Sequence, residues 1–186
     1  AKLLGLTEEE LRRTRPVIEA LRAEFPALRI SIDTRHAEVA RAALLAGADV
    51  VNDITGLADA AMRRVCAERP CGVVLMHMQG SPETMQHAPR YDDVVAEVRA
   101  FFEQRVAQAV ADGIALSRIC LDPGIGFGKT TEHNLALIRH LEKLRVQDLP
   151  MLMALSRKRF LGELLGDATL AKEYALPTVA MSLLAA

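Results

Sequence analysis

The feature that most constrains the fold is a regular alternation of short apolar runs with amphipathic helical patterns. Strands that are apolar along their whole length are buried on both faces, and helices that connect them make them parallel. The sequence therefore predicts an α/β fold with a parallel sheet, which is either open and doubly wound or closed into a (β/α)₈ barrel. The five predicted strands cover residues 29–33, 49–54, 73–78, 119–122 and 151–156.

Helical spacing of apolar residues predicts the segments between and after these strands. Thr7 and Glu10 form a capping-box pattern that predicts the start of the first helix, and Pro16 is expected to kink that helix or to mark its true start. Gly47 and Gly113 are expected to end two of the later helices. The predicted helices cover residues 7–25, 36–45, 60–67, 92–112, 132–144, 160–165 and 169–186.

A glycine-rich segment follows the fourth predicted strand and runs from Asp122 to Lys129, with glycine at every second position from 124 to 128. Its Gly-Lys-Thr ending resembles a phosphate loop, but that pattern requires glycine at the position that Pro123 occupies. Proline has no N–H group to donate to a phosphate. The sequence therefore argues against a nucleotide-binding loop, and Lys129 is either a phosphate contact or a solvated loop lysine.

Polar side chains end all five predicted strands. In α/β proteins the carboxyl ends of the strands face the active site. Single residues of this kind can cap helices, as Asp33 or Thr34 can before residue 36, but five in a row favour a shared site. The strand-end residues are Asp33 and Thr34, Asn52 and Asp53, His77, Asp122, and Ser156 to Lys158.

The chemistry of this set suits a flat, polar heterocycle. A carboxylate accepts paired hydrogen bonds from an amino-pyrimidine edge, an amide both donates and accepts, and a lysine donates to a ring oxygen or nitrogen. Asp33, Asn52, Asp122 and Lys158 supply these groups. Three apolar neighbours are candidates for the walls of the ring site, with ordinary core packing as the competing interpretation. They are Ile54, Met76 and Phe127.

Composition excludes several classes of function. The 186 residues carry a net charge of −1, contain 4% aromatic residues and have no basic run, which argues against nucleic-acid binding. No apolar run approaches the length of a membrane span.

His77 is expected to be a structural hydrogen-bonding residue rather than an acid or base. The three cysteines show no metal-site spacing and indicate a reducing, cytoplasmic setting.

Taken in order, these segments resemble the dihydropteroate synthase family. The resemblance rests on residues 31–34, 52–54, 75–80, 91–94, 121–129 and 156–158, and it covers nearly the whole chain from about Thr7 onward. It implies a (β/α)₈ barrel that condenses 6-hydroxymethyl-7,8-dihydropterin pyrophosphate with p-aminobenzoate. The products would be 7,8-dihydropteroate and pyrophosphate.

The resemblance also implies roles for single residues. Asp33, Asp122 and Lys158 would be catalytic, and the substrates would contact these three together with Asn52, Ile54, Met76, Phe127 and Arg159. It further implies Mg²⁺ as cofactor, a cytoplasmic homodimer and competition by sulfonamides. We expect no nucleic-acid or membrane partner.

The sequence departs from this family in two ways. About five of the eight β-α units of a barrel are recognisable, so residues 1–186 are expected to form one barrel domain that lacks the family's first and last strands. The anion and metal site belongs to those strands, so no metal ligand is expected within the chain, and these residues alone should turn over weakly or not at all. Arg159 also stands where many family members have serine, which leaves sulfonamide response open.

Two alternative functions remain open on the sequence. One is a related pterin-binding barrel that transfers a methyl group from a tetrahydrofolate to a corrinoid protein. The other is a non-catalytic pterin-binding fragment. The Ser-Arg-Lys triplet at residues 156–158 and the loop that ends at Lys129 favour the synthase.

Overall fold

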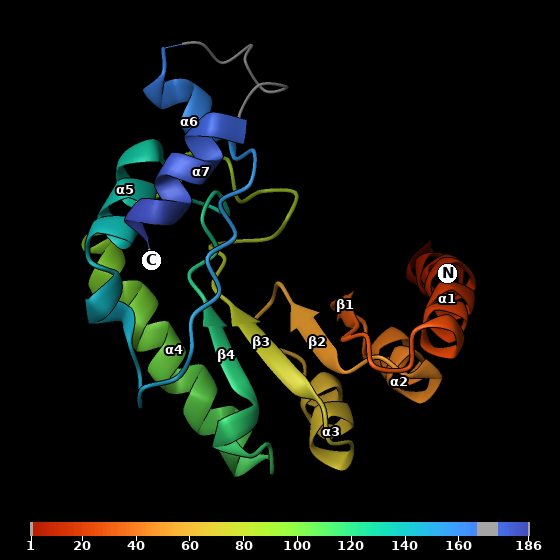
Figure 1. Cartoon of the computed structure of the whole chain (residues 1–186). Helices are drawn as coiled ribbons and strands as arrows, with labels where there is room; N and C mark the ends of the chain where they lie inside the picture. The colour runs from red at the N-terminus through yellow and green to blue at the C-terminus, as the bar shows by residue number, and fades with distance from the viewer. Residues whose placement is uncertain (1, 167–174, 186) are drawn as a thin grey trace. The chain divides into compact units, whose positions relative to one another are not determined.

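The computed structural model describes residues 2–166 and 175–185 (Figure 1). The chain divides into two compact units. Unit 1 contains Ala1–Leu75 and Arg105–Cys120, and unit 2 contains Met76–Gln104 and Leu121–Ala186. The expectation of one barrel domain over the whole chain stays a prediction.

Unit 1 carries most of a parallel sheet. The described residues form four strands in the order β1-β2-β3-β4, namely Ser31–Asp33, Val50–Asp53, Gly72–Met76 and Ile119–Asp122. In β1 and β2, Ile32 pairs with Val51 and Asp33 with Asn52, while Val51 also pairs with Val73 of β3. The paired apolar residues are buried, so the apolar runs form the strands that the sequence predicts.

Helices connect these strands as the helical spacing predicts. Helix α2 (Ala37–Ala46) packs against both α1 (Lys2–Glu24) and α3 (Ala60–Glu68). Gly47 ends α2 with a left-handed φ of 112°, which confirms its predicted role as a helix stop. The 3₁₀ helix η1 (Leu116–Arg118) leads into β4.

Helix α1 differs from its prediction at its beginning. It starts at Lys2, so Thr7 lies inside the helix and the predicted cap at this residue is wrong. Pro16 also lies inside the helix and does not mark its start.

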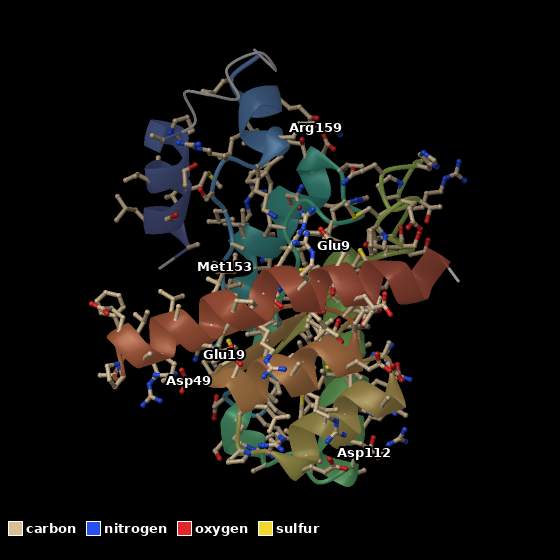
Figure 2. The ribbon with its side chains drawn as sticks, turned by 90° about the vertical axis from the view of Figure 1, so that its right-hand side faces the viewer. Glu9, Glu19, Asp49, Asp112, Met153 and Arg159 are labelled. Carbon is tan, nitrogen blue, oxygen red and sulfur yellow. The ribbon has the colours of Figure 1, made fainter. Side chains whose placement is uncertain are left out.

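The end of α1 is fixed to unit 1 by Arg22, whose guanidinium donates to backbone carbonyls of Pro26, Leu28 and Gly47. It also pairs with the carboxylate of Asp49 at 2.6 Å, and Figure 2 shows Asp49 beside this part of α1.

Unit 2 contains the C-terminal helices and the first part of α4 (Val94–Ala111). The helix predicted over 132–144 is divided in the structure into α5 (Thr131–Arg139) and the 3₁₀ helix η2 (Leu141–Leu144). Helix α6 (Arg159–Leu164) agrees with the prediction, and α7 (Ala175–Leu184) occupies part of the segment predicted over 169–186. Residues 169–174 and 186 of that prediction lie outside the described residues.

The fifth predicted strand, residues 151–156, is reduced to a single parallel bridge between Leu121 and Met151. Leu121 donates to the carbonyl of Pro150 and accepts from the N–H of Leu152. To continue the ladder before this bridge, the next hydrogen bond would need an N–H donor at Pro150. To continue it after the bridge, the next hydrogen bond would need an N–H donor at Pro123. Proline has no N–H group, so the two prolines end the ladder on both sides.

Candidate functional site

In unit 1, Asp33 and Asn52 lie at the ends of neighbouring strands. They are register partners in the parallel sheet, so their side chains leave the same face of the sheet. Asp33 is exposed, yet partial burial of its carboxyl group raises its pKa. A carboxylate and a primary amide are thus presented together, as the strand-end pattern predicts.

The side-chain oxygen of Asn52 is a buried acceptor. Among the residues that the structure describes, this Oδ1 atom is buried and has no hydrogen-bond partner. A buried polar atom without a partner costs about 1–3 kcal/mol, so such atoms in folded proteins usually meet water or a ligand. An N–H donor from a ligand would satisfy it.

Asp53, the next residue, has a different role from Asn52. Its side chain is fully buried and accepts from the backbone N–H and hydroxyl of Thr55 at 2.8 Å and from the N–H of Leu57 at 3.2 Å. Burial raises the pKa of Asp53, and these bonds oppose that rise. Asp53 therefore shapes the turn that carries Ile54, which is half-buried.

In unit 2, the glycine-rich loop (residues 122–128) packs directly on the end of β3. Asp122 is buried and accepts from the N–H of Gly124 at 2.7 Å. A Cβ atom on Gly124 would lie 1.9 Å from the carbonyl oxygen of His77 and 3.3 Å from Cγ of Met76. Gly124 also has a φ of +64°, so glycine is required here for both space and conformation.

Lys129 is buried beneath this loop rather than solvated or directed at a phosphate. Its ammonium lies 3.0 Å from Nδ1 of His77 and donates to the carbonyls of Gly124 and Phe127 at 3.0 and 2.9 Å. Burial and the charge of Lys129 lower the pKa of His77 to about 3, so His77 is neutral and accepts through Nδ1. The structural role predicted for His77 agrees with this geometry.

Lys158 and Phe127 are in contact. The Lys158 ammonium lies 4.4 Å from the centroid of the Phe127 ring, and a Cβ atom on Gly126 would lie 3.3 Å from Lys158 Cδ. Burial lowers the pKa of Lys158, and the negative charge of Asp122 opposes that shift. An aromatic face, a half-buried cation and a buried carboxylate therefore belong to the same part of unit 2.

Arg159 is exposed and paired with a neighbour on its own helix. Its Nε lies 3.1 Å from Glu163, and Glu163 also accepts from the hydroxyl of Thr131. Figure 2 shows Arg159 on α6. These residues line a pocket of about 170 Å³ in unit 2. The pocket is lined by Gln86, Gly126, Lys129, Thr130, Thr131, Asn134, Lys158, Arg159, Phe160 and Glu163.

Three further residues fix the glycine-rich loop, and the strand-end pattern predicts none of them as part of the site. Gln86 donates to the carbonyl of Gly126 at 2.7 Å, and the hydroxyl of Tyr91 donates to the carbonyl of Gly128 at 2.8 Å. Asn134 accepts from the N–H of Gly126. The role of Asn134 could have been predicted from the sequence, because Asn134 is a polar residue on the same helix face as the apolar Leu137 and Ile138.

Two further kinds of feature are absent from the described residues, namely metal-binding clusters and membrane-spanning helices. Within residues 2–166 and 175–185, no group of three or more His, Cys, Asp or Glu side chains is placed to hold a metal ion. No helix in this part of the chain is both long enough and apolar enough to cross a membrane.

Comparison with known proteins decides the family. The family model described as "Pterin binding enzyme" matches residues 5–186. The chain belongs to the pterin binding enzyme family. It is 45% identical to dihydropteroate synthase of Escherichia coli strain K12 over 158 residues, which is 85% of this chain and 56% of that protein.

Solved structures of this family give the same result. Dihydropteroate synthase from Stenotrophomonas maltophilia is 49% identical with a TM-score of 0.91, over 96% of this chain and 66% of that one. The Xanthomonas albilineans enzyme in complex with 7,8-dihydropteroate is 45% identical with a TM-score of 0.88, and the same shares are covered.

These pterin binding enzymes also confirm the predicted fold class. The solved relatives are (β/α)₈ barrels, and the parallel α/β arrangement of this chain is an incomplete barrel. The chain spans a little over half the length of the curated relative and about two thirds of the two solved structures.

Proposed function

We propose that this chain is the pterin-binding part of a dihydropteroate synthase. The observation that carries the proposal is its match, along 96% of its length, to a dihydropteroate synthase that holds 7,8-dihydropteroate. The reaction would join 6-hydroxymethyl-7,8-dihydropterin pyrophosphate to p-aminobenzoate, giving 7,8-dihydropteroate and pyrophosphate.

In this proposal the pterin binds through the polar side chains at the strand ends. Asn52 would use its buried amide oxygen to accept from the pterin, which gives that atom the partner it lacks among the described residues. Asp122 would accept from the amino-pyrimidine edge, and Lys158 would donate to a ring oxygen or nitrogen. Asp33 would lie nearby, and Ile54, Met76 and Phe127 would contact the ring faces.

The proposed chemistry begins with departure of the leaving group. The bond between the pterin methylene carbon and the pyrophosphate oxygen breaks, and the carbon becomes cationic. The carboxylates of Asp33 and Asp122 would stabilise this charge in a preorganised site. The amine of p-aminobenzoate then forms the new C–N bond and loses a proton, so the reaction requires no protein nucleophile.

Arg159 would lie at the aminobenzoate end of the site. Its guanidinium is already paired with the carboxylate of Glu163, so the carboxylate of p-aminobenzoate would compete with Glu163 for it. Sulfonamides would compete for the same position. We therefore propose that both affinities depend on the Arg159–Glu163 pair.

Three further properties complete the proposal. The protein would be a cytoplasmic homodimer, and Mg²⁺ would support the reaction. The residues that the structure describes do not fit a magnesium site by themselves, since they bring no three suitable ligands together. No step described above passes through the metal.

The test is a product assay on the protein as it occurs in the cell. Incubated with dihydropterin pyrophosphate and p-aminobenzoate, it should release pyrophosphate and form 7,8-dihydropteroate in equal amounts. Transfer of a methyl group from methyltetrahydrofolate to a corrinoid protein, without pyrophosphate release, would contradict the proposal. Pterin binding with neither activity would identify a non-catalytic pterin-binding protein instead.

A further inference from the structure

The proposed reaction assigns no role to Lys129, although its side chain is buried in unit 2 and its ammonium is bonded on several sides. The side chain is 3% exposed. Its Nζ atom has four polar contacts within 3.3 Å, which are Nδ1 and the carbonyl oxygen of His77 and the carbonyls of Gly124 and Phe127. An amine this deeply buried requires such contacts to offset the loss of water.

The four acceptors come from two segments. Two belong to His77, which directly follows β3, and two belong to the glycine-rich loop. The compact ammonium of lysine carries three N–H groups on one atom and can serve acceptors on several sides at once. Lys129 therefore ties the loop to the end of the strand.

The same two segments are packed against each other without space for a side chain. A Cβ atom on Gly124 would meet the carbonyl of His77, and one on Gly128 would lie 2.7 Å from the carbonyl of Gln79. The carbonyls of His77, Gly124 and Phe127 all lie within 3.3 Å of the Lys129 Nζ atom. The N–H groups of Lys129 bridge these acceptors, which would otherwise repel one another.

We propose that Lys129 is a positioning residue, which holds the carbonyl of Phe127 so that the Phe127 ring stays beside Lys158. The inference rests on the proposed function, in which Phe127 and Lys158 contact the pterin. The ring and the Lys158 ammonium are 4.4 Å apart, and the backbone of Phe127 is bonded to Lys129 at 2.9 Å. In this inference Lys129 acts on the ligand through Phe127.

A double-mutant cycle tests this indirect action. Affinity for 6-hydroxymethylpterin is measured by calorimetry on the whole protein, its Lys129→Met and Phe127→Ala variants, and the double variant. Residues that act through each other give non-additive effects. Lys129→Met should weaken binding about 10-fold in the wild-type background and less than about 2-fold when Phe127 is already alanine.

Two additional variants complete the design. Lys129→Gln keeps N–H donors at this position, so it should recover part of the affinity and provides a second measurement if Lys129→Met does not fold. Lys143→Met replaces an exposed lysine and should leave affinity unchanged.

The outcomes separate this inference from the proposed function. An equal loss with and without Phe127, or no loss at all while the wild-type protein binds the pterin, overturns the role of Lys129 alone. A folded wild-type protein that does not bind the pterin overturns the proposed function and this inference together.

Discussion

Single buried polar side chains determine how the strand ends of this chain are built. Asn52 and Asp53 are adjacent in the sequence, yet one has an amide oxygen without a partner in the described residues and the other is satisfied by its own turn. The sequence predicts Lys129 in solvent or in contact with a phosphate, whereas the structure buries it. The sequence identifies such residues as polar and cannot tell these roles apart, because each depends on acceptors that distant segments supply.

Stability at acid pH should report the burial of His77. A histidine in an unfolded chain titrates near pH 6.5, whereas His77 has a pKa of about 3 in the folded protein. Between these values the unfolded state binds the additional proton, so the free energy of unfolding falls as the pH is lowered. From pH 7 to pH 4 this group should remove about 3 kcal/mol.

Urea unfolding at a series of pH values measures this contribution. His77→Gln should unfold with a shallower pH dependence below pH 6.5 than the wild-type protein. His87→Gln, at an exposed histidine, should keep the wild-type dependence. Equal slopes for the wild type and His77→Gln would show that His77 is not buried as a neutral group.

At the scale of elements, apolar periodicity predicts the segments and local chemistry sets their limits. The strands β1 to β4 and the helices α2, α3, α4 and α6 agree with prediction in type and approximate position, whereas the helix predicted over 132–144 is divided into α5 and η2. The fifth predicted strand is limited to one bridge, because Pro123 and Pro150 have no N–H group for the ladder hydrogen bonds on either side of it. Both prolines are visible in the sequence, but their effect depends on a register that only the paired strands define.

The glycine-rich loop should be far less tolerant of substitution than a glycine turn of similar conformation. Gly124 and Gly166 have φ values of 64° and 71°, but a Cβ atom would clash with the His77 carbonyl at Gly124 and meets nothing within 4 Å at Gly166. Gly166→Ala should cost about 1 kcal/mol from backbone strain. Gly124→Ala should cost at least about 3 kcal/mol.

Thermal unfolding of the two variants compares steric clash with strain. The difference between their melting temperatures measures the clash, because both substitutions impose the same left-handed backbone on alanine. Equal melting temperatures would mean that the loop does not pack on the His77 carbonyl.

At the scale of the whole molecule, the sequence predicted the family and the incomplete barrel, and the comparisons confirm both. This was possible because the order and spacing of several strand-end segments are together far more specific than any one of these motifs alone. The structure adds contacts that the sequence does not predict, such as the hydrogen bonds that Gln86 and Tyr91 donate to carbonyls of the glycine-rich loop. Those contacts join segments about 40 residues apart.

The central claim is that these strand ends bind a pterin, and calorimetric titration of the whole protein with 6-hydroxymethylpterin tests it most directly. The wild-type protein should bind one pterin per chain. Asp122→Asn should bind it more weakly by about 1–3 kcal/mol, because the amide that replaces the carboxylate cannot accept both hydrogen bonds from the amino-pyrimidine edge. Asp148→Asn, at an exposed aspartate, should bind like the wild type. A folded wild-type protein without pterin binding, or unchanged affinity in Asp122→Asn, would contradict the account.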